Sequence, residues 1–271
     1  IQQLKNNIIA QSHTRHLRRL IFRYAAVAAI VAIIITSGIF LLIANRHGQF
    51  NGTQSTVMVQ TAPGERATTF LPDGTSVAMN YDSYLIWDET SFNQTSRNVR
   101  FEGEGFFNVS KNTALPFEIH SGQLTVTVTG TSFNLRWRAN RNVAQLYLIS
   151  GSVKLTSDMT GESVNVKPGQ LARFDCETGQ FSCDDQPEDG LDQARWRDNE
   201  LVFNASPLSL VITELSGCYG TQIMASPEVD TDILFTGTLP GGDLLEAMHT
   251  LEVTFGVVAQ LHGGTVELIP M

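Results

Sequence analysis

The chain has 271 residues and a formal net charge of −9 at pH 7. Residues 1–64 contain six Lys and Arg and no acidic residue, whereas the remainder contains twelve Lys and Arg and all 27 Asp and Glu, so the two parts carry net charges of +6 and −15. The acidic part argues against nucleic-acid binding, which needs basic patches. Three cysteines are too few for a disulfide scaffold or a four-cysteine zinc site.

Residues 24–44 are apolar, with no charge, Asn, Gln or Pro. As a helix this stretch is about 31 Å long, enough to cross a bilayer, and we predict a transmembrane helix over residues 23–44. Five basic residues precede it and Arg46 follows it, which predicts a cytoplasmic N-terminus and periplasmic C-terminal domains in the inner membrane. A cleaved signal peptide is the alternative, but its apolar region is usually shorter.

The segments on either side of this span have different characters. Residues 1–22 form a basic, amphipathic stretch that begins with Ile1 rather than Met, so we expect the cytoplasmic end of a missing N-terminal domain. Residues 45–56 are polar and lack periodicity, which predicts a short linker.

Residues 57–185 alternate apolar and polar side chains in about a dozen short runs, among them STVMVQT, QLTVTVTG and VAQLYLIS. Turn signals such as Pro72-Asp73-Gly74 and Ser150-Gly151 separate the runs. This spacing predicts an all-β domain, either a sandwich or a solenoid-like stack.

Residues 186–198 are polar and acidic and are predicted to be a second linker. In residues 199–271 the apolar residues recur at helical spacing: Leu208, Val211, Ile212 and Leu215 define one helix face, and the run from Leu244 to Phe255 defines another. Ser206 is expected to cap the first helix, and Gly220 and Gly256 to end the two helices. With the flanking strands and a hairpin turning at Gly263-Gly264, the pattern predicts a small α+β domain of two β-α-β units.

The sequence contains no evident set of catalytic, metal-binding or cofactor-binding residues. Glu102, Glu104 and Glu118 could be a carboxylate pair on a sugar-binding sandwich, but Glu102 and Glu104 are expected to point outward from one strand. Gly103-Glu104-Gly105 is expected to be a strand bulge or turn. The remaining candidates are expected to be surface histidines (His47, His120, His249 and His262) and packed tryptophans (Trp87, Trp137 and Trp196).

Two cysteines flank a predicted hairpin turn. If residues 178–181 form its loop, Cys176 and Cys183 face each other and could form a disulfide, whereas a two-residue Thr178-Gly179 turn makes them diagonal neighbours. Cys218 is expected in the core of a helix face.

The pair Gly130-Thr131 allows a different chemistry. In a strained turn a Thr hydroxyl can attack the preceding glycyl carbonyl, an N→O acyl shift that ends in chain cleavage. The alternative is a turn glycine followed by a strand residue.

Long phrases of the β region resemble the FecR family of membrane anti-sigma regulators, the iron-dicitrate-sensor type. APGERATTFLPDGTSVAMN, RNVRFEGEGFFNVS, LPFEIHSGQLTVTVTGTSFNLR, LISGSVKL and VKPGQLARF follow in the family's order. The C-terminal segment resembles that of the Bacteroidetes branch, which is similar to the short N-terminal domain of secretins and TonB-dependent receptors.

The resemblance implies a regulator that holds an ECF sigma factor through a cytoplasmic domain. It also implies that residues 199–271 contact the signalling domain of an outer-membrane TonB-dependent receptor, and that regulated proteolysis, including cleavage by an intramembrane protease, releases the sigma factor. Thr36, Ser37 and Gly38 are the weakest helical stretch of the span. Gly130-Thr131 matches a self-cleavage site of some members.

Docking to the receptor is expected at an exposed strand edge, either in ILFTGTL or in the C-terminal VELIP strand. Two other readings stay open from the sequence. One is a membrane-anchored periplasmic carbohydrate-binding or hydrolytic β-sandwich protein, and the other is a structural spacer. Apart from self-cleavage no enzyme activity, and no cofactor, is expected.

Overall fold

A computed structural model describes residues 55–185 and 194–271. The predicted transmembrane span lies outside these residues, and no helix among the described ones is long and apolar enough to cross a membrane. The chain from Gln54 to Met271 forms one compact unit.

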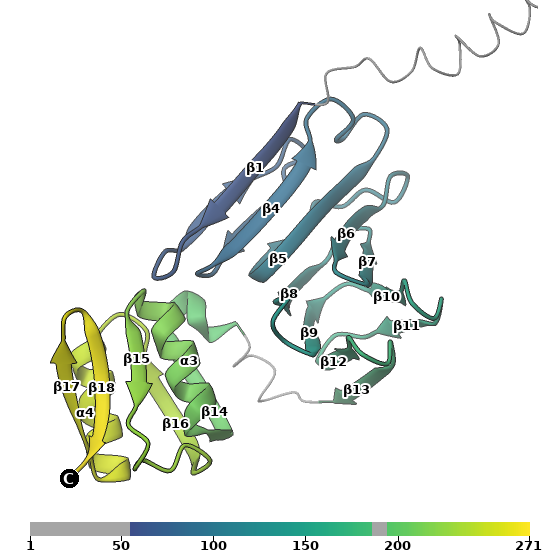
Figure 1. The fold of residues 1–271 in the computed structure, drawn as a ribbon. Helices are drawn as coiled ribbons and strands as arrows, with labels where there is room; N and C mark the ends of the chain where they lie inside the picture. Colours follow the sequence, from purple (N-terminus) through teal and green to yellow (C-terminus); the bar gives the residue numbers. More distant parts are fainter. Residues whose placement is uncertain (1–54, 186–193) are drawn as a thin grey trace, which may run out of the picture. The chain divides into compact units, whose positions relative to one another are not determined.

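The first part of this unit is made of strands, as the period-two pattern predicts (Figure 1). Alternate residues along most strands are buried, because one face of each strand packs on the core. The strands are β1 (Thr56–Thr61), β2 (Ala67–Phe70), β3 (Ser76–Met79), β4 (Ser83–Asp88), β5 (Arg97–Asn108), β6 (Phe117–Ser121), β7 (Leu124–Val128), β8 (Ser132–Trp137), β9 (Val143–Ser150), β10 (Val153–Ser157), β11 (Ser163–Val166), β12 (Gln170–Asp175) and β13 (Phe181–Asp185).

The long strand β5 belongs to two pairing systems at once. Its first half pairs with β4 and β6, and its second half pairs with β3 and β8. The change of partners falls at Gly103, whose φ is +119° and where a Cβ would lie 2.0 Å from Oγ of Ser83. The expected bulge or turn at Gly103-Glu104-Gly105 is therefore the point at which one continuous strand changes partners.

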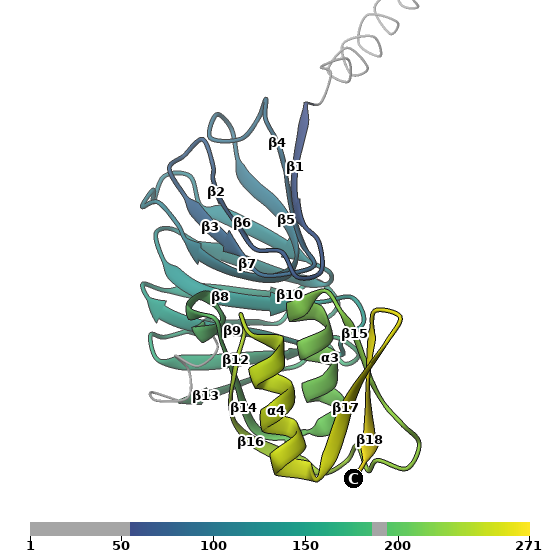
Figure 2. The same cartoon turned by 90° about the vertical axis from the view of Figure 1, so that its left-hand side faces the viewer.

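Each half of β5 leads one run of neighbouring strands. The first run is β5-β6-β7-β10-β11 and the second is β5-β8-β9-β12-β13, with β1-β4 and β2-β3 attached to β5 as well. Figure 2 shows β8, β9, β12 and β13 following one another. Side chains from both runs, including Phe101, Phe107, Phe117 and Phe133, share one hydrophobic cluster, which is the arrangement of a sandwich.

The C-terminal part contains two helices and five strands. Helices α3 (Leu208–Tyr219) and α4 (Leu244–Phe255) contact strands of two small sheets. Both helices end at glycines in the left-handed region, Gly220 and Gly256, as predicted. The strands are β14 (Glu200–Pro207), β15 (Gln222–Ala225), β16 (Leu234–Pro240), β17 (Val257–His262) and β18 (Thr265–Pro270).

The start of α3 differs from the expectation. Strand β14 continues to Pro207, and the hydroxyl of Ser206 donates to the carbonyl of Asn204 instead of capping the helix. The chain there makes a β-bulge opposite β16, and Ala205 has a φ of +44°. The bulge, rather than a side-chain cap, sets where the helix begins.

Strand pairing in the C-terminal part decides between the two expected docking strands. Strand β18 lies between β15 and β17 and pairs with both, so the VELIP strand has no free edge and that expectation is wrong. Strand β16 pairs only with β14 among the described strands. Its other edge is open.

The structure excludes the disulfide between Cys176 and Cys183 that the sequence left open. In the β12–β13 pair Cys183 lies opposite Ala172, and Phe174 lies opposite Phe181. Cys176 is therefore four residues from the position that faces Cys183, or about 13 Å along the strand. A disulfide needs Cα atoms within about 7 Å, and all three cysteines have free thiols.

Candidate functional site

A polar junction joins the sandwich to the C-terminal helices, and it begins at Trp196. Residues Arg195–Asp198 form a short 3₁₀ helix, η1, at the end of the segment expected to be a linker. The indole of Trp196 is 5% exposed, and its Nε1 donates to Oδ1 of Asn134 in β8 at 3.1 Å. The guanidinium of Arg66 lies 5.9 Å from the indole ring centre.

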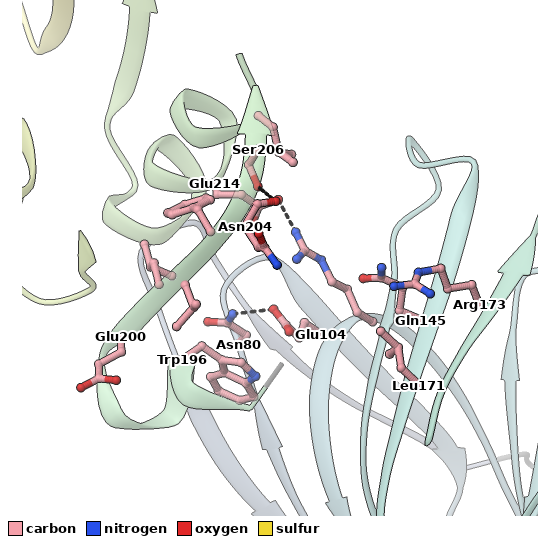
Figure 3. A pocket seen from close by; sticks show the side chains of 15 residues that line it. Asn80, Glu104, Gln145, Leu171, Arg173, Trp196, Glu200, Asn204, Ser206 and Glu214 are labelled. Atoms are coloured by element: carbon pink, nitrogen blue, oxygen red, sulfur yellow. Dashed lines mark hydrogen bonds and ion pairs between the residues drawn. The ribbon is translucent and has the colours of Figure 1, made fainter. Parts of the chain in front are cut away.

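Glu104 is the buried acceptor at the sandwich side of this junction. Its carboxylate accepts hydrogen bonds from the amides of Asn80 at 2.9 Å and Asn134 at 3.2 Å (Figure 3). The side chain is only 5% exposed, although it lies at an outward position of β5, as predicted. It faces outward from the sandwich core, but the C-terminal part covers it.

Glu214 of α3 is the corresponding acidic group on the helical side. Its carboxylate accepts a hydrogen bond from the Tyr81 hydroxyl at 2.6 Å and pairs with Arg136 and, at 2.8 Å, with Arg141. All three partners come from the sandwich, more than seventy positions earlier in the chain. Glu214 therefore ties α3 to the sandwich.

The charges of this cluster are set by their surroundings. Burial by itself raises the pKa of Glu214. Arg136, the Tyr81 hydrogen bond and Arg141 together lower the pKa by more than burial raises it, so the net pKa lies below its usual value. Burial, followed by the negative charge of Glu214, raises the pKa of Tyr81 far above its usual range. Tyr81 therefore stays a hydrogen-bond donor to an ionised carboxylate at neutral pH.

Close backbone contact fixes the position of α3. A Cβ on Gly217 would lie 2.1 Å from the ring of Tyr81, and the amide of Gly64 donates to the carbonyl of Gly217 at 2.8 Å. At Gly220 a Cβ would lie 2.8 Å from the carbonyl oxygen of Pro63. The loop after β1 thus packs directly on the last turn of α3.

A cavity of about 330 Å³ lies beside this cluster. In Figure 3, β14 runs along one side of it, and Gln145, Leu171 and Arg173 lie on the other. Glu104, Trp196 and Glu214 also line it. The lining is mostly polar, and the cavity is accordingly suited to hydrogen-bonding groups.

The remaining sequence candidates do not join this site. Glu102 accepts from the Tyr84 hydroxyl at 2.7 Å and from the amide of Ala139 at 3.0 Å, and Glu118 lies in β6. Trp87 is buried in the sandwich core and Trp137 packs against it, as expected. Among the described residues, no three His, Cys, Asp or Glu side chains gather at metal-binding distances; His47 lies outside them, His120 contacts Thr125, His249 is near Glu252, and His262 ends β17.

Gly130-Thr131 lies at the turn before β8. Gly130 has a φ of +147°, and a Cβ there would lie 2.8 Å from the backbone of Lys111, so the position requires glycine. The buried hydroxyl of Thr131 donates to the carbonyl of Ser152 at 3.2 Å. Self-cleavage at this peptide stays a prediction.

The junction residues were not found from the sequence, although Gly217 gave a usable signal. Glycine inside a helix is unfavourable by about 1 kcal/mol relative to alanine, so its presence near the end of an apolar helix face indicates a close neighbour. Glu214 on the flank of that face is a second signal, since acids are rarely buried without partners.

Residues 58–154 match the model of the FecR protein family. This chain carries a FecR domain. The match runs from within β1 to the start of β10 and includes all of β5 and the strand β8 that holds Asn134 and Arg136. The resemblance seen in the sequence is therefore confirmed for this segment, which forms the sandwich side of the junction.

Solved structures share the fold over a longer region than the FecR match. Two crystal structures of a Parabacteroides distasonis protein, provisionally described as an anti-sigma factor, are 24% identical to the chain, with TM-scores of 0.70 and 0.69. They cover 80% and 79% of this chain, and 99% of their own length is covered. At this identity the likeness establishes the fold. No match was found among curated protein sequences.

Proposed function

We propose that this FecR-domain protein is an inner-membrane sigma regulator of the anti-sigma type. In this proposal it relays a signal from an outer-membrane TonB-dependent receptor to a cytoplasmic ECF sigma factor through regulated proteolysis. The observation that carries the proposal is the FecR match over residues 58–154. The fold shared with the Parabacteroides protein supports it.

The membrane topology is part of the same proposal. Residues 23–44 would span the inner membrane once, with residues 1–22 in the cytoplasm and the FecR domain in the periplasm, as the basic flank before residue 24 indicates. An intramembrane protease would cut near Thr36, Ser37 and Gly38. The role of the protein is then to bind and relay rather than to catalyse.

Receptor docking is proposed at the outer edge of β16. This edge faces away from β14 and carries no charged side chain, and Leu234 at its start is 60% exposed. Unpaired backbone groups on such an edge can accept a strand from a partner. Thr238→Pro would remove one of these donors without removing a bond to β14. The amide of Gly241 donates to the carbonyl of Asn199, and because the two kinds of pair alternate along the strands, Thr238 and Val202 form a non-hydrogen-bonded pair.

A reporter of sigma-dependent transcription in the source organism tests the proposal. Deleting the gene should change expression of a small set of genes that includes a TonB-dependent receptor. Restoring the wild-type gene should reverse the change, and restoring the Thr238→Pro variant should leave the response to the receptor's ligand impaired. A deletion strain with unaltered transcription would contradict the proposal.

The carbohydrate-binding alternative gains no specific support. Such sites usually present aromatic rings to a sugar, whereas Trp87 and Trp196 are buried and Trp137 packs against Gly122 and the core. Glu104 is engaged by two amides rather than paired with a second carboxylate.

A further inference from the structure

The cavity beside β14 meets the edge of that strand rather than one of its faces. Side chains of a strand point alternately to its two faces, so a cavity on one face is lined by every second residue. Here five consecutive residues, from Glu200 to Asn204, line the cavity. The backbone of β14 is therefore what the cavity exposes.

The direction of the free backbone groups follows from the pairing with β16. Glu200 lies opposite Pro240, which has no N–H, and the amide of Gly241 donates to the carbonyl of Asn199. The Glu200–Pro240 pair is thus a non-hydrogen-bonded pair. Because the two kinds of pair alternate, Val202 opposite Thr238 is non-hydrogen-bonded as well, and its N–H and C=O point away from β16 toward the cavity.

The opposite wall of the cavity supplies a cation with a replaceable partner. Arg173 of β12 lines the cavity and pairs with Asp184, whose side chain is half exposed. Such exposed pairs contribute little to stability, so a carboxylate on a ligand can compete for this guanidinium. Gln145 and Leu171 add an amide and an apolar surface to the same wall.

Three carboxylates also line the cavity, but they do not prevent an acidic ligand from binding there, because each already has a partner. Glu104 accepts from two amides, Glu214 pairs with two arginines, and Glu200 pairs with Arg195 at 2.7 Å. Arg136 is held by Glu214. Arg173 is therefore the charged group of the lining that is most open to exchange.

We propose that this cavity binds a short extended peptide segment of another protein, which adds as a strand to the outer edge of β14 and places an Asp or Glu side chain against Arg173. The volume of 330 Å³ is at the lower end of ligand sites, which fits a few residues in extended form. The site is separate from the docking edge of β16 and does not depend on the regulatory role proposed above.

The test uses residues 54–271, which form one compact unit and correspond to nearly the whole of the crystallised relatives. A displayed library of random nonapeptides is selected on this protein, and the enriched sequences are synthesised with a fluorescent label. Dissociation constants are measured by anisotropy for the wild type and for Val202→Pro, Thr238→Pro and Arg173→Gln. Hydrogen exchange of the Val202 amide is followed with and without peptide.

Enriched peptides should contain Asp or Glu, bind about tenfold more weakly to Val202→Pro, and lose about threefold or more with Arg173→Gln, as expected for a lost main-chain bond and a lost ion pair. Thr238→Pro should bind within about twofold of the wild type, since the Thr238 amide lies on β16 and points away from β14 and its cavity. The Val202 amide of the unaltered protein should be protected on binding.

Three results would overturn the proposal directly, and a fourth would move the peptide to another strand. The three are a selection that enriches no peptide above background, enriched peptides that bind Val202→Pro as tightly as wild type, and a Val202 amide that exchanges equally fast with and without peptide. The exchange measurement needs no substitution, so it decides the question even if Val202→Pro unfolds. Loss of binding in Thr238→Pro alone would assign the peptide to β16 and overturn it too.

Discussion

The ring of Tyr81 lies directly against the backbone of Gly217 in α3. A methyl group at that position would come within 2.1 Å of the ring, and the Tyr81 hydroxyl continues to Glu214 one helical turn earlier. The FecR domain and the C-terminal part therefore meet at a glycine that the helix itself disfavours. Tyr81 lies in the FecR domain but belongs to the hydrophobic cluster of the C-terminal part.

The first prediction concerns this contact. Gly217→Ala should destabilise the 54–271 unit by about 1–3 kcal/mol, because the added methyl overlaps the Tyr81 ring and more than offsets the gain in helix propensity. Thermal unfolding of the purified unit measures the change. Thr213→Ala, at an exposed position of the same helix, is the control and should be neutral. Equal melting temperatures for Gly217→Ala and wild type would show that the contact is looser than described.

The second prediction concerns pH. The pKa of Glu214 is lower in the folded protein than in the unfolded chain, so its contribution is complete above about pH 4.5 and disappears as the pH falls through the folded pKa. Glu214→Gln should cost about 1–3 kcal/mol at pH 7. The difference between variant and wild type should shrink at pH 3, and urea unfolding at the two pH values checks this.

Other carboxyl groups with lowered pKa values, including Asp88, Asp175 and Glu228, titrate in both proteins. Their effect cancels in the difference between variant and wild type. A difference that stayed constant from pH 7 to pH 3 would mean that Glu214 is not ionised in the folded state.

The third prediction concerns the turn before β8. The self-cleavage hypothesis predicts that purified protein shows a fragment ending at Gly130 on a denaturing gel, and that Thr131→Val, which removes the nucleophile, gives one intact band. Mass spectrometry of the fragment identifies the terminus. A single intact band in the wild type would reject the hypothesis and leave Gly130 as a glycine required by its φ and by Lys111.

The fourth prediction concerns the interior of the FecR domain. Arg97 is fully buried, pairs with Asp73 at 3.0 Å, and donates to the carbonyls of Leu115, Ser110 and Asn112. Asp73→Asn should lower stability by about 3 kcal/mol or more, because it leaves a buried guanidinium without its counter-charge. Asp158→Asn, which affects an exposed carboxylate, is the matched control. A small loss of stability in Asp73→Asn would show that the three carbonyls alone are enough to stabilise the buried guanidinium.

Local patterns predicted much of the fold. Alternation marked most strands of the FecR domain, and the spacing of Leu208, Val211 and Leu215 marked α3, because one face of each element is buried. The alternation does not show in β4, since the apolar Ile86 on its outer face lies between the buried Leu85 and Trp87. Apolar side chains on both faces obscure a period of two.

Pairings between distant segments could not be predicted in this way. Strand β18 lies in the centre of its sheet because it also pairs in parallel with β15, 43 residues earlier, and nothing within either strand specifies that partner. The register that separates Cys176 from Cys183 depends on the length of one turn. The junction of Tyr81 with Glu214 depends on the docking of α3 onto the sandwich, which a single sequence does not encode locally.

The most direct test of the regulator proposal is capture of the intact protein from membranes of the source organism. A tag at the C-terminus leaves the cytoplasmic end free, and mass spectrometry identifies co-purified proteins from cross-linked cells. The proposal predicts that an ECF sigma factor is enriched with the wild-type protein and is lost when the cytoplasmic segment that contains residues 1–22 is removed. Recovery of the membrane-anchored protein without any sigma factor would contradict it.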